Sequence, residues 1–247
     1  MLGHTPSQHF NPVIPAGASA GMSEATASGI RQHRFDPYDN NGGSILAIAG
    51  EDFCIVAADT RQSTGYHINS RYAPKAFKLN ETAAIASSGF YGDITNLNKR
   101  LQMQLRLYKS NHQKDMPVTA LAQMLSGMLY QNRFFPIYSF NIVGGIDEQG
   151  RGAVFHFDVV GSFQREWYRA DGTGQALMQP FLDNQLGFKN QQNVEPKLPT
   201  LERAIGLARD AFNSTTERDI YTGDQLEIFI FQAGCPVRVE TFPLKKD

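Results

Sequence analysis

Two short apolar runs near residue 50 constrain the fold more than any other feature of the chain. The runs are SILAIA (44–49) and FCIVAAD (53–59), and only Gly50, Glu51 and Asp52 separate them. Runs of this length, rich in Ile, Val and Ala, are typical of buried strands. Because so short a link turns the chain back on itself, the sequence predicts an antiparallel hairpin over residues 44–59.

The apolar period changes after a third strand-like run, TAAIASSG (82–89). Apolar residues then recur every three or four positions, at Ile94, Leu97, Leu101, Leu105 and Tyr108. After Pro117 a second stripe follows with the same period, at Leu121, Met124, Leu125, Met128 and Leu129. Such spacing places apolar side chains on one face of a helix. The sequence therefore predicts two successive helices whose stripes lie in the core.

The second half of the chain returns to strand-like runs before two further helices. The expected strands are YSFNIVGG (138–145), GAVFHFD (152–158) and the polar QREWYRA (164–170). Helices are expected over 174–186 and 199–217, with a long polar loop at 187–199 between them. LEIFIFQ (226–232) and PVRVETF (236–242) then form a closing strand pair.

This order of elements does not alternate as parallel βαβ units do. The predicted class is therefore α+β with antiparallel sheets. Two sheets packed face to face, with a helix layer on each outer side, would bury all the apolar stripes.

Composition narrows the classes of function. The formal net charge of −1 argues against a generally basic binder of nucleic acid or membrane surfaces, although it leaves room for local basic patches. No run of 18 apolar residues and no secretory signal is visible. Cys54 and Cys235 lack a CxxC or Cys/His spacing, so we expect reduced packing residues and a cytosolic or nuclear location. Residues 1–36 are rich in Pro, Gly, Ser and Ala without periodicity, which predicts a disordered arm or removable leader.

Polar residues at predicted strand ends and turns are the candidates for chemistry. They are Asp59 with Arg61, Lys75 after Pro74, Gly172-Thr173-Gly174, and Asp219 with Thr222. Taken singly, each also fits a structural role as a strand end, a solvated side chain, a turn or a cap. His156 is expected to be a hydrogen-bonded structural residue. No phosphate-loop, dinucleotide or metal-protease motif is present, so no cofactor and no metal is predicted.

Several segments link these residues through a family resemblance. They are GGSILAIAGEDFCIVAADTR, Pro74-Lys75, SSGFYGD (87–93), VGGIDEQGRGAVFHFDVVGS (143–162), DGTGQA (171–176) and ERDIYTGD (217–224). Together they make the chain resemble the proteasome beta-type subunits, a branch of the N-terminal nucleophile hydrolases. The resemblance implies a four-layer αββα sandwich of two mainly antiparallel sheets.

The resemblance also implies the places of the catalytic residues. Active members use an N-terminal threonine whose hydroxyl attacks the peptide carbonyl and whose amino group can serve as base. The matching register places that nucleophile at Gly43, which has no hydroxyl. The supporting positions fall on Asp59, Lys75, Thr173, Asp219 and Thr222. We therefore expect a vestigial pocket in which Asp59 and Asp219 flank Lys75 as a charge network.

The function that the resemblance implies is a non-catalytic structural subunit of the 20S proteasome beta ring. The leader (1–33) would be removed near His33-Arg34, leaving a single domain over 34–247. The implied partners are beta and alpha subunits in a stacked-ring particle of about 28 subunits, acting in ATP- and ubiquitin-dependent protein degradation in cytoplasm and nucleus.

Two other functions stay open. The first is an active peptidase that uses Ser44 after cleavage at Gly43. A shift of one residue along a strand would turn that side chain away from Lys75, which argues against it. The second is a stand-alone binding module, which would be a soluble monomer.

Overall fold

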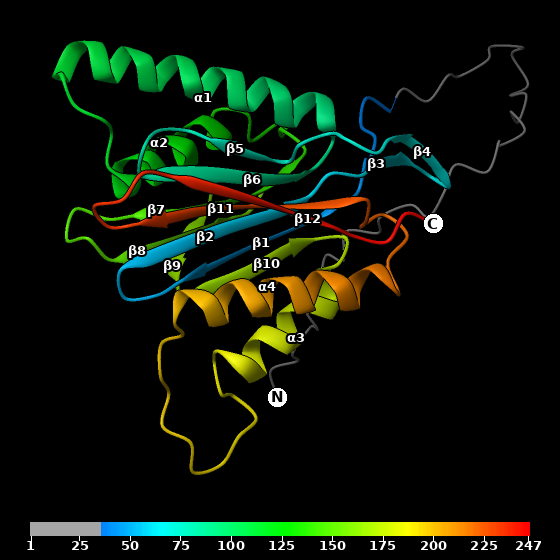
Figure 1. Cartoon of the computed structure of the whole chain (residues 1–247). Coiled ribbons are helices and arrows are strands. Elements are labelled where there is room, and N and C mark those ends of the chain that lie inside the picture. The colour runs from blue at the N-terminus through cyan, green and yellow to red at the C-terminus, as the bar shows by residue number, and fades with distance from the viewer. Residues whose placement is uncertain (1–35) are drawn as a thin grey trace, which may run out of the picture. The chain divides into compact units, whose positions relative to one another are not determined.

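The computed structural model describes residues 36–247, and residues 38–247 form one compact unit (Figure 1). The strands are β1 (Ser44–Ala49), β2 (Phe53–Asp59), β3 (Gln62–Thr64), β4 (His67–Ser70), β5 (Ala76–Lys78), β6 (Ala83–Gly89), β7 (Ser139–Ile146), β8 (Gly152–Phe157), β9 (Phe163–Glu166), β10 (Tyr168–Gly172), β11 (Gln225–Gln232) and β12 (Arg238–Pro243). The helices are α1 (Tyr91–His112), α2 (Val118–Tyr130), α3 (Gln175–Gln185) and α4 (Leu201–Thr216).

The predicted hairpin is confirmed and forms the centre of the first sheet. β1 and β2 pair antiparallel, with Ile45 opposite Ala58 and Ala49 opposite Cys54. The strand order of this sheet is β10-β1-β2-β11-β12, and all its pairings are antiparallel. Both strands of the hairpin are buried along their whole length, which explains why residues 45–49 and 53–58 are continuously apolar.

The second sheet has the strand order β5-β6-β7-β8-β9 and is also antiparallel throughout. β3 and β4 form a separate two-stranded hairpin. The predicted mixture of helices and antiparallel sheets is therefore confirmed.

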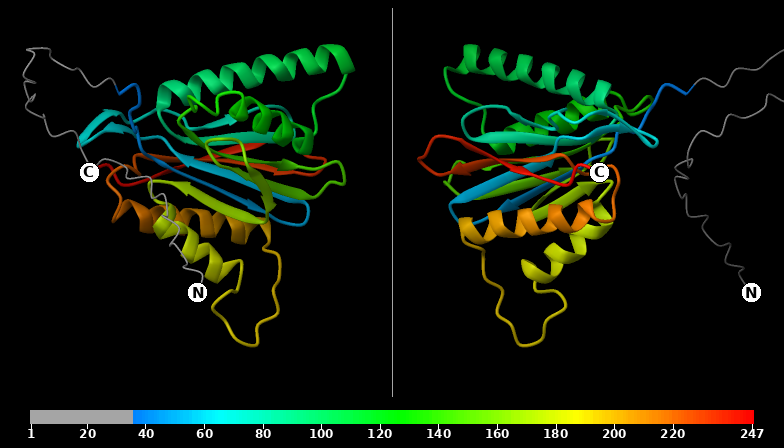
Figure 2. Two further views of the ribbon diagram at one scale, coloured as in Figure 1. Left: turned by 180° about the vertical axis from the view of Figure 1, so that it is seen from behind. Right: turned by 45° about the vertical axis from the view of Figure 1, so that its right-hand side comes forward.

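Figures 1 and 2 show α1 and α2 on one side of the sheets and α3 and α4 on the other. Three apolar clusters hold these helices and sheets together. One cluster joins the first sheet to α3 and α4, and a second joins the other sheet to α1 and α2. The third lies between the two sheets. Alternation along β2 serves two of them, because Ile55 and Ala57 face the helices while Cys54 and Val56 face the opposite sheet.

The helical periodicity predicts the buried faces correctly. Ile94, Leu97, Leu101 and Leu105 are the buried apolar residues of α1. The stripe of α2 is buried as well, apart from Met124, which is half-buried. Among residues 36–247 no helix is long and apolar enough to span a membrane.

The prediction of a single strand over residues 164–170 is wrong. β9 ends at Glu166 and pairs with β8 in the second sheet, whereas β10 begins at Tyr168 and pairs with β1 in the first. Trp167 alone separates them, so the chain crosses between the sheets within one residue. No glycine or proline lies at the crossing, so the polar run predicts one continuous strand. The short strands β3, β4 and β5 were not predicted because they lack an extended apolar pattern.

Candidate functional site

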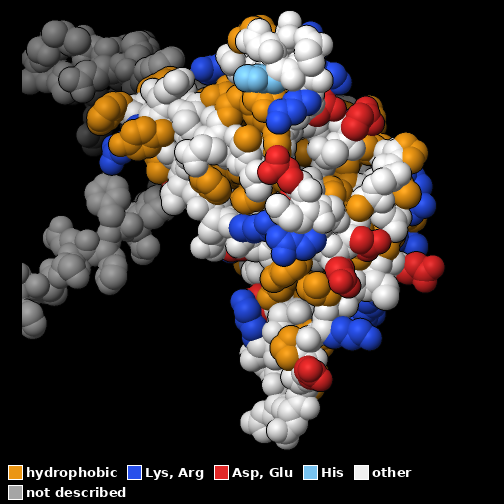
Figure 3. Space-filling model, turned by 90° about the vertical axis from the view of Figure 1, so that its left-hand side faces the viewer, with side chains coloured by type: hydrophobic (Ala, Val, Ile, Leu, Met, Phe, Trp, Pro, Cys, Tyr) orange, Lys and Arg blue, Asp and Glu red, His pale blue; other side chains and the backbone are white. Residues whose placement is uncertain are grey.

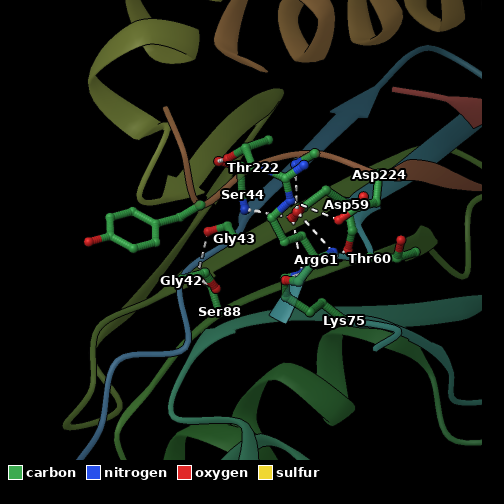
Figure 4. A network of polar contacts seen from close by, with 12 residues as sticks. Gly42, Gly43, Ser44, Asp59, Thr60, Arg61, Lys75, Ser88, Thr222 and Asp224 are labelled. Carbon is green, nitrogen blue, oxygen red and sulfur yellow. Dashed lines mark hydrogen bonds and ion pairs between the residues drawn. The ribbon is translucent and has the colours of Figure 1, made fainter. Parts of the chain in front are cut away.

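Three of the predicted site residues meet where the ends of the two sheets come together (Figure 4). Gly43 lies directly before β1, and Asp59 is the last residue of β2. Lys75 lies directly before β5, the edge strand of the second sheet. Residues 32 positions apart in sequence are thus brought into contact by the packing of the sheets.

Lys75 is buried and held by three oxygen atoms. Its Nζ lies 3.2 Å from Asp59 Oδ1 and donates hydrogen bonds to the carbonyl oxygens of Asp59 at 3.0 Å and Arg61 at 2.6 Å. Three is the number of protons on an ammonium group, so its donors are fully used. Burial nevertheless lowers the pKa of Lys75, because this effect exceeds the opposing attraction of Asp59.

The Asp59 carboxylate is completely buried and also accepts three backbone hydrogen bonds. Its Oδ1 accepts from the N–H of Ser44 at 2.9 Å, and its Oδ2 accepts from Gly223 at 3.2 Å and Arg61 at 3.3 Å. Burial raises the pKa of Asp59, and this effect exceeds the opposing effect of the Lys75 charge and of the hydrogen bonds from the backbone. Each charge is therefore expensive to bury, and each depends on its partner.

Gly43 has no room for a side chain in this arrangement. A Cβ atom at this position would lie 2.0 Å from Cε of Lys75, 2.8 Å from its Nζ and 2.9 Å from Asp59 Oδ1. The φ angle of Gly43 is +91°, which L-residues with a side chain rarely adopt. Lys75 therefore occupies the space that a side chain on residue 43 would need.

The other predicted residues form a cluster of hydroxyl groups around Asp219, which adjoins the first group because the N–H of Thr173 donates to the carbonyl oxygen of Gly43 at 3.1 Å. Thr173 Oγ1 and Thr222 Oγ1 each donate to Asp219 Oδ2 at 2.7 Å. Ser44 Oγ lies 2.6 Å from Thr222 Oγ1 and accepts a hydrogen bond from the N–H of Gly174 at 2.9 Å. The hydroxyl groups thus connect Ser44 through Thr222 to Asp219.

The predicted charge network therefore needs a correction. Asp219 makes no ion pair with Lys75, and its carboxylate is used by the two threonines and by the N–H of Tyr221. The more distant carboxylate that favours the charged form of Lys75 is Asp224. Sequence spacing did not reveal this difference, because Asp219 and Asp224 lie on the same short connection between α4 and β11.

Asp224 is a buried residue of the site that the sequence analysis does not predict. Arg61 Nε lies 2.7 Å from its Oδ2, and Arg71 Nη1 lies 2.5 Å from its Oδ1. Arg61 also donates to the carbonyl oxygens of Ile220 at 2.9 Å and Lys245 at 3.2 Å. This buried cluster fixes the backbone of Arg61, whose carbonyl holds Lys75. The only sign of this residue in the sequence is its place as the last residue of the segment ERDIYTGD (217–224).

His156 lies outside the pocket and has the structural role predicted for it. Its Nε2 lies 2.8 Å from Asp171 Oδ2. His156 is on β8 of the second sheet and Asp171 on β10 of the first, so this contact connects the two sheets. The predicted cleavage residues His33 and Arg34 lie outside the described residues.

Among residues 36–247 the pocket holds a lysine, an aspartate and hydroxyl groups, but position 43, which lies beside Lys75 and Asp59, carries no hydroxyl group. The hydroxyl of Ser44 is fully buried and points to Thr222 instead. Its backbone N–H, in contrast, is bound to Asp59. The site can position charge and hydrogen-bond donors, but the residue beside the lysine offers no nucleophile.

Comparison with known proteins gives a consistent set of relatives. A family model described as "Proteasome subunit" matches residues 39–231. The chain is 51% identical over 231 residues to proteasome subunit beta type-1-B of Carassius auratus, covering 94% of this chain and 97% of the relative. It is 48% identical to proteasome subunit beta type-1 of Arabidopsis thaliana, covering 88% and 99%. It is 45% identical to proteasome subunit beta type-6 of Saccharomyces cerevisiae, covering 93% and 98%.

Proposed function

Because the chain belongs to the proteasome subunit family, we propose that it is a non-catalytic structural subunit of the beta ring of the 20S core particle. Its partners are other beta subunits and alpha subunits, in a stacked-ring particle of about 28 subunits. Its role there is to help build the chamber for ATP- and ubiquitin-dependent protein degradation, in cytoplasm and nucleus. The leader is removed near His33-Arg34 before the mature subunit functions.

One observation carries the non-catalytic assignment. The residue beside Lys75 and Asp59 is Gly43, and the lysine side chain fills the space that a nucleophilic side chain would need. Removing a hydroxyl removes the reacting atom itself, whereas the threonines at 173 and 222 keep the hydroxyl groups of the supporting cluster. The site is thus a scaffold without its nucleophile.

The packing supports the same family fold. We propose that the three apolar clusters correspond to the interfaces of a four-layer αββα sandwich, as in N-terminal nucleophile hydrolases. Under this proposal the pocket lies at one end of the sheet–sheet interface. The buried pair of Lys75 and Asp59 then acts as a structural contact between the two sheets.

The alternative is a peptidase that uses Ser44 after cleavage between Gly43 and Ser44. A free amine at Ser44 would lie beside Asp59, which favours this alternative electrostatically. Its hydroxyl, however, is bound to Thr222 and to the N–H of Gly174, on the side away from Lys75. The geometry therefore favours the non-catalytic subunit.

Intact-mass measurement of the subunit within its purified particle tests both proposals. The particle is first treated with an irreversible inhibitor that reacts with N-terminal threonines, whose labelled subunits serve as the positive control. We expect this chain to begin near Arg34 and to carry no label. A chain beginning at Ser44, or a labelled one, would refute the non-catalytic assignment. Recovery of the chain only as a free monomer would refute the particle assignment and support a stand-alone binding module.

A further inference from the structure

A cavity lies between the long polar loop at 187–199 and the edge of the first sheet. Its volume is about 330 Å³, at the lower end of the range for sites that bind small molecules. Four separate stretches of the chain line it: the end of β1 (48–49), the crossing between the sheets (167–168), the residues after α3 (186–189) and the last part of the loop (196–199). We call it the loop cavity.

The wall of the loop cavity is apolar from its base to its mouth. Ile48 and Ala49 are buried, whereas Trp167 is 48% exposed and Leu198 is 39% exposed. In Figure 3 the loop projects at the bottom of the molecule, and hydrophobic and basic side chains adjoin each other where it meets the body. A ligand entering from solvent would therefore meet a continuous apolar surface.

Hydrogen bonds fix the wall of the loop cavity. The N–H of Ala49 donates to the carbonyl oxygen of Trp167 at 2.7 Å, which holds the crossing against the end of β1. The hydroxyl of Tyr168 donates to Asp183 Oδ1 at 2.9 Å, and Lys189 Nζ lies 3.0 Å from the same oxygen. These contacts tie the beginning of the loop to α3 and β10. Binding a ligand against this wall therefore requires little rearrangement.

The charge around the loop cavity is positive. Lys189 and Lys197 line it, and no Asp or Glu is among the lining residues. Lys189 is paired with Asp183, but Lys197 is exposed and forms no ion pair within residues 36–247. One unpaired cation beside an apolar wall matches a ligand that has one negative charge and an apolar body. A free phosphate would leave the apolar wall unused.

The backbone around the loop cavity argues against a peptide as the ligand. Pro196 and Pro199 have no N–H, and the N–H groups of Ala49, Gly187 and Lys189 already donate to carbonyl oxygens of the protein. A peptide would therefore bury amide groups that these residues could not satisfy. A carboxylic acid with a hydrocarbon body has no such groups.

We propose that the loop cavity binds a small apolar monocarboxylate, such as an aromatic acid. The ring of the acid packs against Trp167 and Leu198, and its carboxylate pairs with Nζ of Lys197 at the mouth of the cavity. The bound acid connects the loop to the first sheet. The loop cavity shares no residue with the pocket around Lys75, so this ligand site is independent of the proposed function.

Quenching of Trp167 fluorescence tests the site, because Trp167 is the only tryptophan of the chain. The purified full chain is titrated with 4-iodobenzoate, whose iodine atom quenches a tryptophan that it contacts, and in parallel with the neutral 4-iodobenzamide. We expect saturable quenching by the acid, with an affinity at least about three-fold higher than that of the amide. Quenching that rises linearly with concentration, or equal affinities for the two compounds, would overturn the proposal.

Removing the charge at residue 197 tests the role of the lysine. Lys197→Gln should weaken binding of 4-iodobenzoate about three-fold and leave binding of 4-iodobenzamide unchanged. The matched control is Lys114→Gln, which changes another exposed lysine without an ion pair in the described chain, located between α1 and α2. This control should leave both affinities unchanged. The same affinity for the acid in the two variants would refute the pairing with Lys197.

Shortening the apolar side chain at residue 198 tests the contact with the ring. Leu198→Ser should weaken binding of both compounds at least about three-fold, because apolar contact area is lost. Circular dichroism and the thermal midpoint of each variant show whether it is folded when quenching is measured. A folded Leu198→Ser variant with unchanged affinities would place the ligand outside the loop cavity and overturn the proposal.

Discussion

The pocket at the end of β2 and the turn between β7 and β8 each bury an aspartate that pairs with basic side chains. In the pocket, Asp59 faces Lys75, and both side chains are almost completely buried. In the turn, Asp147 faces Arg165 at 2.7 Å and Arg151 at 3.5 Å, and these arginines are 37% and 56% exposed. Burial raises the pKa of Asp59, despite Lys75. It also tends to raise the pKa of Asp147, but the hydrogen bonds from Arg165 and the backbone outweigh it, and the pKa is lowered.

The difference shows what each aspartate does. The arginines of the turn keep one end in water, so their pairing with Asp147 requires little desolvation. Asp147 can also accept hydrogen bonds from the N–H groups of Gln149 and Arg151, which closes the turn. In the pocket both members of the pair lose their hydration, so forming the pair costs desolvation free energy. Removing either partner would nevertheless strongly destabilise the fold, because the other charge would stay buried without a partner.

Truncating the lysine of the pocket should have the largest effect. Lys75→Ala would leave the buried Asp59 carboxylate without its partner, and we expect a loss of about 3–5 kcal/mol in the free energy of unfolding. Urea denaturation of the full chain measures it. Arg165→Ala, the matched change in the turn, should cost at most about 1 kcal/mol because that arginine is partly solvated. Equal costs for the two variants would remove the distinction between the two regions.

Adding a single methyl group to Gly43 should have the next largest effect. Gly43→Ala would force Cβ against Cε of Lys75 at a φ of +91°, and we expect a loss of about 2–4 kcal/mol. The control is Gly65→Ala, where φ is +57° but no atom lies within 4 Å of the added Cβ. In this variant only the strained backbone conformation should matter, with a loss of about 1 kcal/mol in the free energy of unfolding. Thermal and urea unfolding that give the same loss for both glycines would show that Lys75 does not fill the site.

The dependence of stability on acid pH should reveal the contribution of Asp147 in the turn between β7 and β8. Asp147→Asn keeps an acceptor oxygen but loses the charge, and we expect a loss of about 1 kcal/mol at neutral pH. Because the folded-state pKa of Asp147 is lowered, its charge contributes fully above the unfolded pKa of about 4 and is lost as pH falls through the folded value. The difference between wild type and variant should therefore be constant above about pH 5 and shrink in acid. A difference that grows on acidification would contradict the sign of the shift.

Regular periodicity allowed most of the fold to be predicted. The hairpin β1–β2 follows from two continuous apolar runs joined by a short link, and the helix α1 follows from apolar residues spaced three and four apart. The split at Trp167 could not be predicted, because β9 and β10 are both polar and partly exposed, and their separation depends on which sheet each one joins. Sheet membership is a tertiary property that local propensity does not encode.

The candidate site likewise contains positions that the sequence predicts and contacts that it does not. Positions tied to a matching motif, such as Gly43, Asp59 and Lys75, come together as predicted. The contacts within the pocket do not follow from the sequence: the prediction that Asp219 flanks Lys75 is wrong, because its carboxylate binds Thr173 and Thr222. That distinction depends on a turn over residues 217–224, where rotations of the backbone direct neighbouring carboxylates to different groups.

The strand order of the first sheet also dictates when the protein can be completed during synthesis. β2 emerges from the ribosome early, yet its neighbour β11 ends at Gln232 and the Arg61 cluster uses the carbonyl of Lys245. The hairpin β1–β2 must therefore wait, with one long edge unpaired, until almost the whole chain has been translated. Contacts of such long sequence separation form slowly. The nascent chain consequently exposes the edge of β2, which is prone to aggregation, for most of its synthesis. Binding of a chaperone would be most useful during this interval.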